Sequence, residues 1–413
     1  MNLFLKEKIM QTSVIGFPRI GTLRELKFAS EKYFRNEISA QQLLDTAENL
    51  RKIHWTTQQS AGIDYIPCND FSFYDIFLDT AALFNIIPKR YKELQLPELD
   101  TYFAMARGYQ GKSGDVKALA MKKWFNTNYH YIVAEVEDDT DIQLVGEKPW
   151  NEYNEAKALG ILTKPVIIGP YTLMKHCRYT GEKKLADFVD AVVSAYQDFV
   201  KKCEELEIAW VQFDEPALVQ DMTADDIALF HRLYDELLPA AKTSKILLQT
   251  YFGDVRNIYP DLIKMDFAGI GLDFIEGKQT LSLIETCGFP KKKLLFAGLV
   301  NGKNIWKNHY EKTLKVLKAL QEKENSVVLS TSCSLLHVPY TLKHEDKLSQ
   351  TFISYFAFAE EKLEELHELS ILADVADYSS HAAYQNNQKL FAQPRDCYND
   401  AVKDRLAHVT EAD

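Results

Sequence analysis

Three cationic side chains lie close together in the segment GFPRIGTLRELK, residues 16–27. They are Arg19, Arg24 and Lys27, in a chain whose formal net charge is −11. Arginine can bind a carboxylate or phosphate through two parallel N–H groups, and lysine adds a point charge. The cluster therefore indicates a site for a small anion. The pattern alone leaves a second interpretation open, a solvated helix face in which Arg24 pairs with a distant carboxylate.

The same segment carries a helix-start pattern. Thr22 is followed three residues later by Glu25, the spacing of a capping box, which predicts a helix from about Leu23. Arg24 and Lys27 would then be neighbours on the first turns of that helix. A cation at a helix N-terminus meets an unfavourable dipole interaction of roughly 0.3–1 kcal/mol. The placement of two cations there favours a bound anion that offsets this repulsion.

Two further motifs could carry chemistry. In KKWFNTNYHY, residues 122–131, Lys123 precedes Trp124 and could contact an anion beside an aromatic ring. A surface lysine before a buried tryptophan explains the pair equally well. In FDEPAL, Asp214 and Glu215 end an apolar run, where they could bind a substrate amine or act as a base. They could also cap the following turn.

The elements that would position these residues alternate between strand and helix. Short apolar runs rich in β-branched and aromatic residues predict strands at 13–18, 64–70, 128–136, 165–171, 209–216, 245–252, 267–274, 294–302 and 326–336. Long amphipathic segments separate them, and this alternation indicates a parallel sheet. Polar residues follow the runs, as they do at the carboxyl ends of the strands in (β/α)8 barrels: Arg19, Asp70, Asp214, Glu215, Thr250, Asp273, Asn301 and Cys333.

The expected fold class is therefore α/β, a TIM-like (β/α)8 barrel with accessory strand and helical insertions and a helical C-terminal extension. Residues 128–136 alternate in polarity and suit an accessory strand, which leaves eight barrel strands. Helices are predicted at 46–62, 183–206 and 223–241, and the last opens with a capping-box-like pattern. Residues 347–372 predict one long amphipathic helix.

The predicted organisation has three parts. Residues 1–12 form an N-terminal extension and residues 13–375 form the barrel. Residues 376–413 form a helical, polar segment that leads toward a linker and a catalytic barrel lying outside this chain.

The composition and charge of the chain limit the kinds of partner that it can bind. No basic tract of the nucleic-acid-binding type is present, and the acidic chain would repel a phosphate backbone. No apolar run approaches the length of a membrane span, and the first residues lack the apolar core of a signal peptide. Six dispersed cysteines without a C-x-x-C pair indicate reduced thiols. We therefore expect a cytoplasmic protein that binds neither nucleic acid nor membrane.

The motifs resemble a known family: GFPRIGTLRELK, DFSFYDIFLDTAALF, LDTYFAMARG, KWFNTNYHYIV, QFDEPAL, TYFGD and STSCSLLHVP. In this order they resemble the N-terminal half of cobalamin-independent methionine synthase, over about residues 12–405. The resemblance implies a two-barrel enzyme that transfers the methyl group of 5-methyltetrahydrofolate to homocysteine. It also implies that the first barrel binds the polyglutamate tail of 5-methyltetrahydropteroyltriglutamate through Arg24, Glu25, Leu26, Lys27 and Lys123. Arg19 is a possible additional contact.

The resemblance further implies that zinc, held by one histidine, two cysteines and a glutamate, belongs to a second barrel. We expect that barrel to follow this chain and to be its partner. Compared strand by strand, Thr250 and Phe252 occupy the places of the first histidine and cysteine, Asp273 lies near that of the glutamate, and Cys333 matches the last cysteine. Zinc sites usually have three or four protein ligands. We therefore expect no metal site and no catalytic residue in this chain.

The remaining candidate ligands are expected to be structural. Cys333 would be a relic of a ligand or a core thiol. His337 lies near it in the sequence, but the two residues supply too few ligands for a metal ion. His130 would be hydrogen-bonded in the core. Asp214 and Glu215 match an acidic motif whose substrate role belongs to the second barrel, so they are expected to be structural here. The chain alone is then an inactive half of a methyltransferase. The alternatives are a self-sufficient single-barrel methyltransferase acting on a thiol or corrinoid, and a purely structural barrel.

Overall fold

The computed structural model describes residues 10–323, 326–392 and 399–410. Within them, one sheet of eight parallel strands forms the centre of the molecule. Its strands are β1 (Gln11–Ser13), β2 (Ile66–Cys68), β8 (Thr163–Ile168), β10 (Trp210–Asp214), β11 (Lys245–Gln249), β12 (Gly269–Asp273), β13 (Leu294–Val300) and β14 (Ser326–Thr331). The order in the sheet is β1-β14-β13-β12-β11-β10-β8-β2.

The two edge strands of this sheet meet and close the barrel. Ser13 forms a parallel bridge with Tyr65, just before β2. The Tyr65 N–H donates to the Thr12 oxygen at 2.9 Å, and the Val14 N–H donates to the Tyr65 oxygen at 3.3 Å. The predicted (β/α)8 barrel is thus confirmed. The predicted segment 128–136 lies outside it, also as expected.

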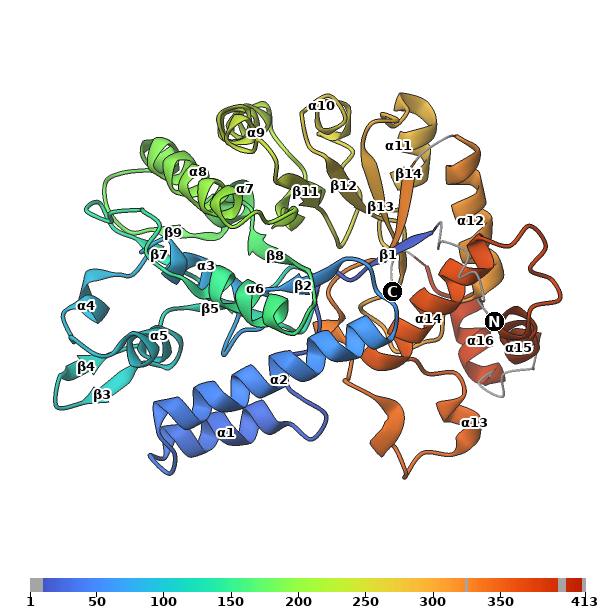
Figure 1. Cartoon of the computed structure of the whole chain (residues 1–413), viewed down its shortest axis with the longest axis horizontal. Helices are drawn as coiled ribbons and strands as arrows, with labels where there is room; N and C mark the ends of the chain where they lie inside the picture. Colours follow the sequence, from blue (N-terminus) through green and yellow to red (C-terminus); the bar gives the residue numbers. More distant parts are fainter. Residues whose placement is uncertain (1–9, 324–325, 393–398, 411–413) are drawn as a thin grey trace.

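Helices surround the strands, as Figure 1 shows for α8, α9, α10 and α11. The α-helices are α1 (Glu25–Phe34), α2 (Ala40–Ser60), α3 (Ile76–Leu83), α4 (Lys89–Lys92), α5 (Glu98–Arg107), α6 (Lys148–Ala158), α7 (Pro170–His176), α8 (Val189–Glu205), α9 (Ala224–Leu237), α10 (Tyr259–Leu262), α11 (Thr280–Cys287), α12 (Tyr310–Glu322), α13 (Gln350–Ile353), α14 (Ala359–Ala373), α15 (Ala382–Ala392) and α16 (Asp400–Ala407). None of the described helices is both long enough and apolar enough to cross a lipid bilayer.

The core lies inside the barrel and between the strands and their helices. Every residue of β8 and of β12 is buried, as expected for parallel strands that are covered on both faces. The helix α8 turns one apolar stripe toward the strands, in which Val192, Tyr196 and Phe199 recur at helical spacing and are buried. The predicted capping box at the start of α9 is confirmed, since the Thr223 hydroxyl accepts from the Asp226 N–H at 3.2 Å.

A long insertion between β2 and β8 carries the accessory elements. Besides α3–α6 it contains the antiparallel pairs β3 (Tyr109–Gly111) with β4 (Gly114–Val116) and β5 (Met121–Lys123) with β6 (His130–Ile132). A further strand, β7 (Glu135–Val136), pairs with β9 (Arg178–Tyr179), which follows α7. The insertion is therefore joined through β7 to the segment that follows α7.

Three sequence-based boundaries were wrong. The strand predicted at 13–18 lies at Gln11–Ser13, so the first barrel strand begins inside the predicted extension 1–12. The single helix predicted at 347–372 is broken between α13 and α14. Residues 355–357 pair there with another segment: the Lys307 N–H donates to the Tyr355 oxygen at 2.9 Å, and the Ala357 N–H donates to the Ile305 oxygen at 2.7 Å. The third boundary is the start of α1, at the candidate site.

Candidate functional site

The helix α1 begins at Glu25 rather than at Leu23. Arg24 precedes it in a left-handed backbone conformation, with φ 65° and ψ 35°. The Glu25 carboxylate accepts a 3.0 Å hydrogen bond from the Leu23 N–H, so it does not reach back to Thr22 as a capping box requires. The predicted capping box was therefore wrong. A left-handed conformation costs a residue with a side chain about 1–2 kcal/mol, so the surroundings hold Arg24 there.

The four residues of the RELK segment have different environments. Leu26 is 3% exposed and packs with Ala47, Leu50 and Phe71, so it anchors the helix rather than facing a ligand. Glu25 is half-buried, whereas Arg24 and Lys27 are exposed. Lys27 lies 3.7 Å from Glu31 in an exposed ion pair. Arg24 forms no side-chain hydrogen bond, ion pair or ring contact with any residue that the structure describes.

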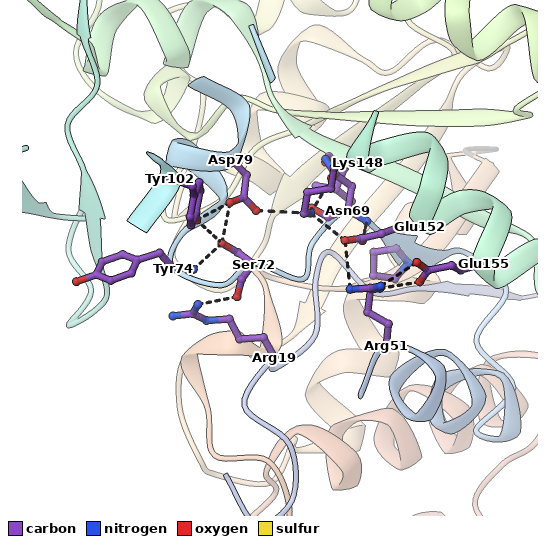
Figure 2. A network of polar contacts seen from close by, with 12 residues as sticks. Arg19, Arg51, Asn69, Ser72, Tyr74, Asp79, Tyr102, Lys148, Glu152 and Glu155 are labelled. Carbon is purple, nitrogen blue, oxygen red and sulfur yellow. Dashed lines mark hydrogen bonds and ion pairs between the residues drawn. The ribbon is translucent and has the colours of Figure 1, made fainter. Parts of the chain in front are cut away.

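Arg19 is held by a polar network that Figure 2 shows from close by. Its Nη1 donates a 2.6 Å hydrogen bond to the backbone oxygen of Ser72. The Ser72 hydroxyl donates to an Asp79 carboxylate oxygen at 3.0 Å, and the Tyr102 hydroxyl donates to the same oxygen at 2.6 Å. One N–H of the guanidinium is therefore fixed, and the remaining N–H groups make no hydrogen bond to the described residues.

The network continues as ion pairs to residues of the helices α6 and α2, as Figure 2 shows. Lys148 Nζ lies 3.5 Å from Asp79 and 3.0 Å from Glu152. Glu152 also accepts the backbone N–H of Asn69 at 2.8 Å and lies 4.0 Å from Arg51. Burial lowers the pKa of Lys148, but the Glu152 and Asp79 carboxylates outweigh burial and raise it. The loop after β2 is thereby tied to α2 and α6.

The loop after β2 in turn supports the segment that carries the cations. The Asp70 carboxylate accepts a 2.7 Å hydrogen bond from the Phe17 N–H. Burial raises the pKa of Asp70 to about 6. The segment that leads from β1 to α1 therefore rests on a framework of buried hydrogen bonds and ion pairs.

Lys123 lies on a separate element, the β5–β6 hairpin. It is exposed and stands opposite His130, while the neighbouring Trp124 is 5% exposed. Lys123 makes no side-chain contact with the residues that the structure describes. The expectation of a core histidine was wrong, because His130 is exposed and its Nδ1 lies 3.1 Å from the Asn128 oxygen.

A cavity of about 900 Å³ opens beside this hairpin, and we call it the hairpin cavity. Its walls come from the hairpin, from the end of α7 with the start of β9, and from the segments that follow β10 and β11, so it lies at the carboxyl ends of the barrel strands. Four cationic side chains line it: Lys122, Lys123, Lys175 and Arg178. Its aromatic lining includes Phe125, Tyr131, His176 and Phe252.

The structure brings only some of the predicted residues together. Arg24 and Lys27 share the start of α1, and Lys123 lines the hairpin cavity, whereas Arg19, Arg24 and Lys27 do not line it. Lys175 and Arg178 were not predicted from the sequence. The available signal was the run KHCRY, residues 175–179, which begins in the last turn of the helix that follows the buried strand β8.

The acidic pair of the FDEPAL motif has structural partners. The Glu215 carboxylate accepts from the Tyr171 N–H at 2.9 Å, the Thr172 N–H at 2.7 Å and the Tyr234 hydroxyl at 2.6 Å. It therefore caps the start of α7. Asp214 accepts from Gln212 Nε2 at 2.7 Å and from the Tyr251 hydroxyl at 3.1 Å, one bond to each of its oxygens. Both carboxylates are buried and every one of their oxygens is already hydrogen-bonded within the protein.

The donors compared with the zinc ligands do not form a metal site. No group of three or more histidine, cysteine, aspartate or glutamate side chains within the described ranges has metal-binding geometry. The Asp273 carboxylate accepts three backbone N–H groups, from Phe252, Ile275 and Glu276. Burial raises the pKa of the Cys333 thiol well above its usual value, and burial lowers that of His337 to about 4. The residues present therefore do not fit a zinc ion.

The fold and the cations at the carboxyl ends of the strands define the class of protein. It is a (β/α)8 barrel that presents positive charge at that end. A family model described as the N-terminal domain of cobalamin-independent synthase matches residues 11–325. The chain belongs to the cobalamin-independent methionine synthase family.

Relatives named 5-methyltetrahydropteroyltriglutamate–homocysteine methyltransferase are similar to nearly the whole chain. The one from Campylobacter jejuni subsp. doylei is 51% identical over 404 residues, and the one from Streptococcus thermophilus is 52% identical over the same length. Each alignment covers 98% of this chain and 53% of the relative. The chain thus spans about half the length of these relatives.

Solved structures support the fold. A putative vitamin-B12 independent methionine synthase from Listeria monocytogenes superimposes with a TM-score of 0.59 at 15% identity, over 88% of this chain and 96% of that one. A methyltransferase from Methanosarcina mazei gives a TM-score of 0.52 at 12% identity, over 88% and 94% of the two chains. At these identities the likeness is one of fold alone.

Proposed function

We propose that this chain is the folate-polyglutamate-binding half of a cobalamin-independent methionine synthase. The complete enzyme would transfer the methyl group of 5-methyltetrahydrofolate to homocysteine and so form methionine. In this proposal Arg24, Lys27 and Lys123 bind carboxylates of the tail of 5-methyltetrahydropteroyltriglutamate. The observation that carries it is Arg24, an exposed cation in a left-handed conformation whose side chain forms no hydrogen bond or ion pair with the described residues.

The proposed binding is electrostatic. An arginine that has no protein carboxylate nearby can offer its paired N–H groups to a ligand carboxylate without first breaking an ion pair. Lys27 is only weakly engaged, since its pair with Glu31 is long and exposed. Arg19 is a possible further contact, because its guanidinium keeps free N–H groups while Ser72 fixes its direction. Leu26 and Glu25 serve this site by holding the start of α1.

We propose that the chain does not transfer the methyl group by itself. Zinc, when bound in a second barrel, would hold homocysteine as a thiolate. The donors of this chain are buried and already hydrogen-bonded, which supports a catalytic barrel as partner over a self-sufficient thiol or corrinoid methyltransferase. A cytoplasmic location is proposed on the dispersed thiols, of which Cys68, Cys177, Cys203, Cys287 and Cys333 are free.

Calorimetric titration tests this proposal, with triglutamyl and monoglutamyl 5-methyltetrahydrofolate titrated into the same preparation. We expect the triglutamyl form to bind more tightly, and the difference to shrink as salt is raised, because exposed charge pairs are screened. Zinc content and methyl transfer to homocysteine are measured on the same sample. Equal affinity for the two forms would overturn the tail assignment. Stoichiometric zinc with turnover would support the single-barrel methyltransferase instead.

A further inference from the structure

We propose that the hairpin cavity is a second carboxylate subsite, in which Lys122, Lys175 and Arg178 bind the carboxylates of polyglutamate tails longer than three residues. This inference rests on the proposed function. Arg24, Lys27 and Lys123 supply three cations for a triglutamyl tail, and a longer tail carries further carboxylates. Lys123 belongs to the proposed triglutamyl-tail site and also lines the hairpin cavity. A tail that reaches Lys123 therefore reaches the edge of the cavity.

Three of the four cations around the cavity lack a close ion pair with the described residues, and Lys175 is the exception. Lys122, like Lys123, forms no hydrogen bond or ion pair with the described part of the chain. Arg178 has one distant carboxylate neighbour, Glu135 at 3.9 Å, and its side chain is 64% exposed. Glu135 is already paired with Arg90 at 2.7 Å. The guanidinium of Arg178 is thus available to a carboxylate from outside.

Lys175 adds a fixed charge to the same space. Its Nζ lies 2.6 Å from Asp226, so its position is set by α9. Burial, and to a smaller extent the positive charges of Lys122 and Lys175, lower the pKa of His176 to about 4. The His176 imidazole is therefore neutral at pH 7 and adds no charge of its own to the cavity.

The shape and lining of the cavity suit a flexible polyanion. A volume of about 900 Å³ is far larger than a single carboxylate or phosphate needs. The rings of Phe125 and Phe252 lie 5.8 Å apart and form one apolar wall. A γ-glutamyl chain alternates carboxylates with methylene groups, so it can place charge against the lysines and methylene groups against the rings. A compact anion would use only one side of this space.

The test compares mono-, tri- and pentaglutamyl 5-methyltetrahydrofolate by calorimetric titration into the full chain. The cavity variant is Lys122→Gln with Arg178→Gln, two residues whose exposed side chains lack close ion pairs, so folding is not at risk. The matched control is Lys201→Gln with Lys202→Gln on α8, which removes the same charge from exposed pairs elsewhere. Thermal unfolding of each variant confirms that the fold is unchanged.

We expect the pentaglutamyl form to bind the parent chain about tenfold more tightly than the triglutamyl form, an increment of one charge-assisted contact. The cavity variant should lose this gain, and the control should keep it. If pentaglutamyl and triglutamyl forms bind equally, or if the gain survives in the cavity variant, the cavity inference is overturned while a triglutamyl preference over monoglutamyl still supports the proposed function. If triglutamyl and monoglutamyl forms bind equally, the proposed function itself fails.

Discussion

At the scale of single residues, Arg24 combines an unfavourable backbone conformation with an unengaged side chain. Its φ of 65° lies in the region that glycine tolerates best, and its guanidinium forms no hydrogen bond or ion pair with a described residue. A side chain that contributed only to stability would be expected to make contacts within the protein. Replacing Arg24 with glycine should therefore lower the affinity for the tail without lowering the free energy of unfolding.

The variant Arg24→Gly tests this separation. Glycine relieves the left-handed strain, so we expect the free energy of unfolding to stay equal or rise by up to about 1 kcal/mol. Affinity for the triglutamyl form should nevertheless fall by about 1–3 kcal/mol, because a charge-assisted contact is lost. Denaturant unfolding and calorimetric titration measure the two quantities on one sample.

Glu207→Gly is the matched control, because Glu207 is also exposed and left-handed, with φ 56°. It should change stability in the same direction and leave tail affinity unchanged. A loss of stability in Arg24→Gly, with affinity retained, would show that Arg24 serves the fold instead.

At the scale of elements, the loop after β2 is held by charges on two helices. Glu152 on α6 is 3% exposed and lies between the cations Lys148 and Arg51, and it also accepts the Asn69 N–H. Its neighbour Glu155, one turn further along α6, pairs with the same Arg51 at 2.8 Å but is 29% exposed. The two glutamates therefore differ in burial while sharing a partner.

Glu152→Ala should lower the free energy of unfolding by about 2–3 kcal/mol, because it leaves the buried Asn69 N–H without its acceptor and removes a carboxylate that Lys148 and Arg51 share. Glu155→Ala should lower it by about 1 kcal/mol, since its pair is partly solvated. Urea unfolding followed by circular dichroism gives both values. Similar losses for the two variants would mean that the buried network does not hold the loop.

At the scale of the whole molecule, buried histidines make stability depend on pH. His54 is 5% exposed, and its ring packs against Phe17 and Tyr340 at centroid distances of 5.4 and 5.7 Å. Burial and, to a smaller extent, the positive charge of Arg51 lower its pKa to about 3. The unfolded chain therefore binds a proton near pH 6.5 that the folded chain does not. This contribution to stability is complete above pH 6.5 and is lost as the pH falls toward 3.

His54→Phe removes this titration and keeps an aromatic ring in place. Between pH 6 and 4, we expect the unfolding free energy of the parent to fall more steeply than that of the variant, by about 1.4 kcal/mol per pH unit. Comparing the slopes of the two proteins cancels the titration of the other buried groups. Parallel slopes would mean that His54 accepts a proton in the folded state at its ordinary pKa.

The sequence predicted the barrel because buried parallel strands are local apolar runs, each visible without knowledge of its neighbours. It failed in two ways. Residues 355–357 leave the helical pattern because they pair with the distant residues 305–307, and the local pattern does not reveal that partner. The start of α1 moves because the Glu25 carboxylate accepts from the nearby Leu23 N–H, so the spacing of a capping box was present while its hydrogen bonds were not.

The candidate site was predictable only in part. The cations of residues 16–27 are close together in the sequence, so the sequence was enough to predict them as a cluster. The cations of the hairpin cavity come from residues 122–123 and 175–178, and only the closed barrel with its inserted hairpin brings them together. Proximity of this kind is a property of the fold rather than of spacing.

The central claim is that cations at the carboxyl ends of the barrel strands, Arg24 among them, bind the carboxylates of the polyglutamate tail. One double-mutant cycle tests this claim most directly. It combines Arg24→Ala with the exchange of the triglutamyl for the monoglutamyl ligand, and each of the four affinities is measured by calorimetry. We predict a coupling of about 1–3 kcal/mol, because Arg24 can act only when the tail is present. A coupling near zero, with both ligands weakened equally or not at all, would contradict the account.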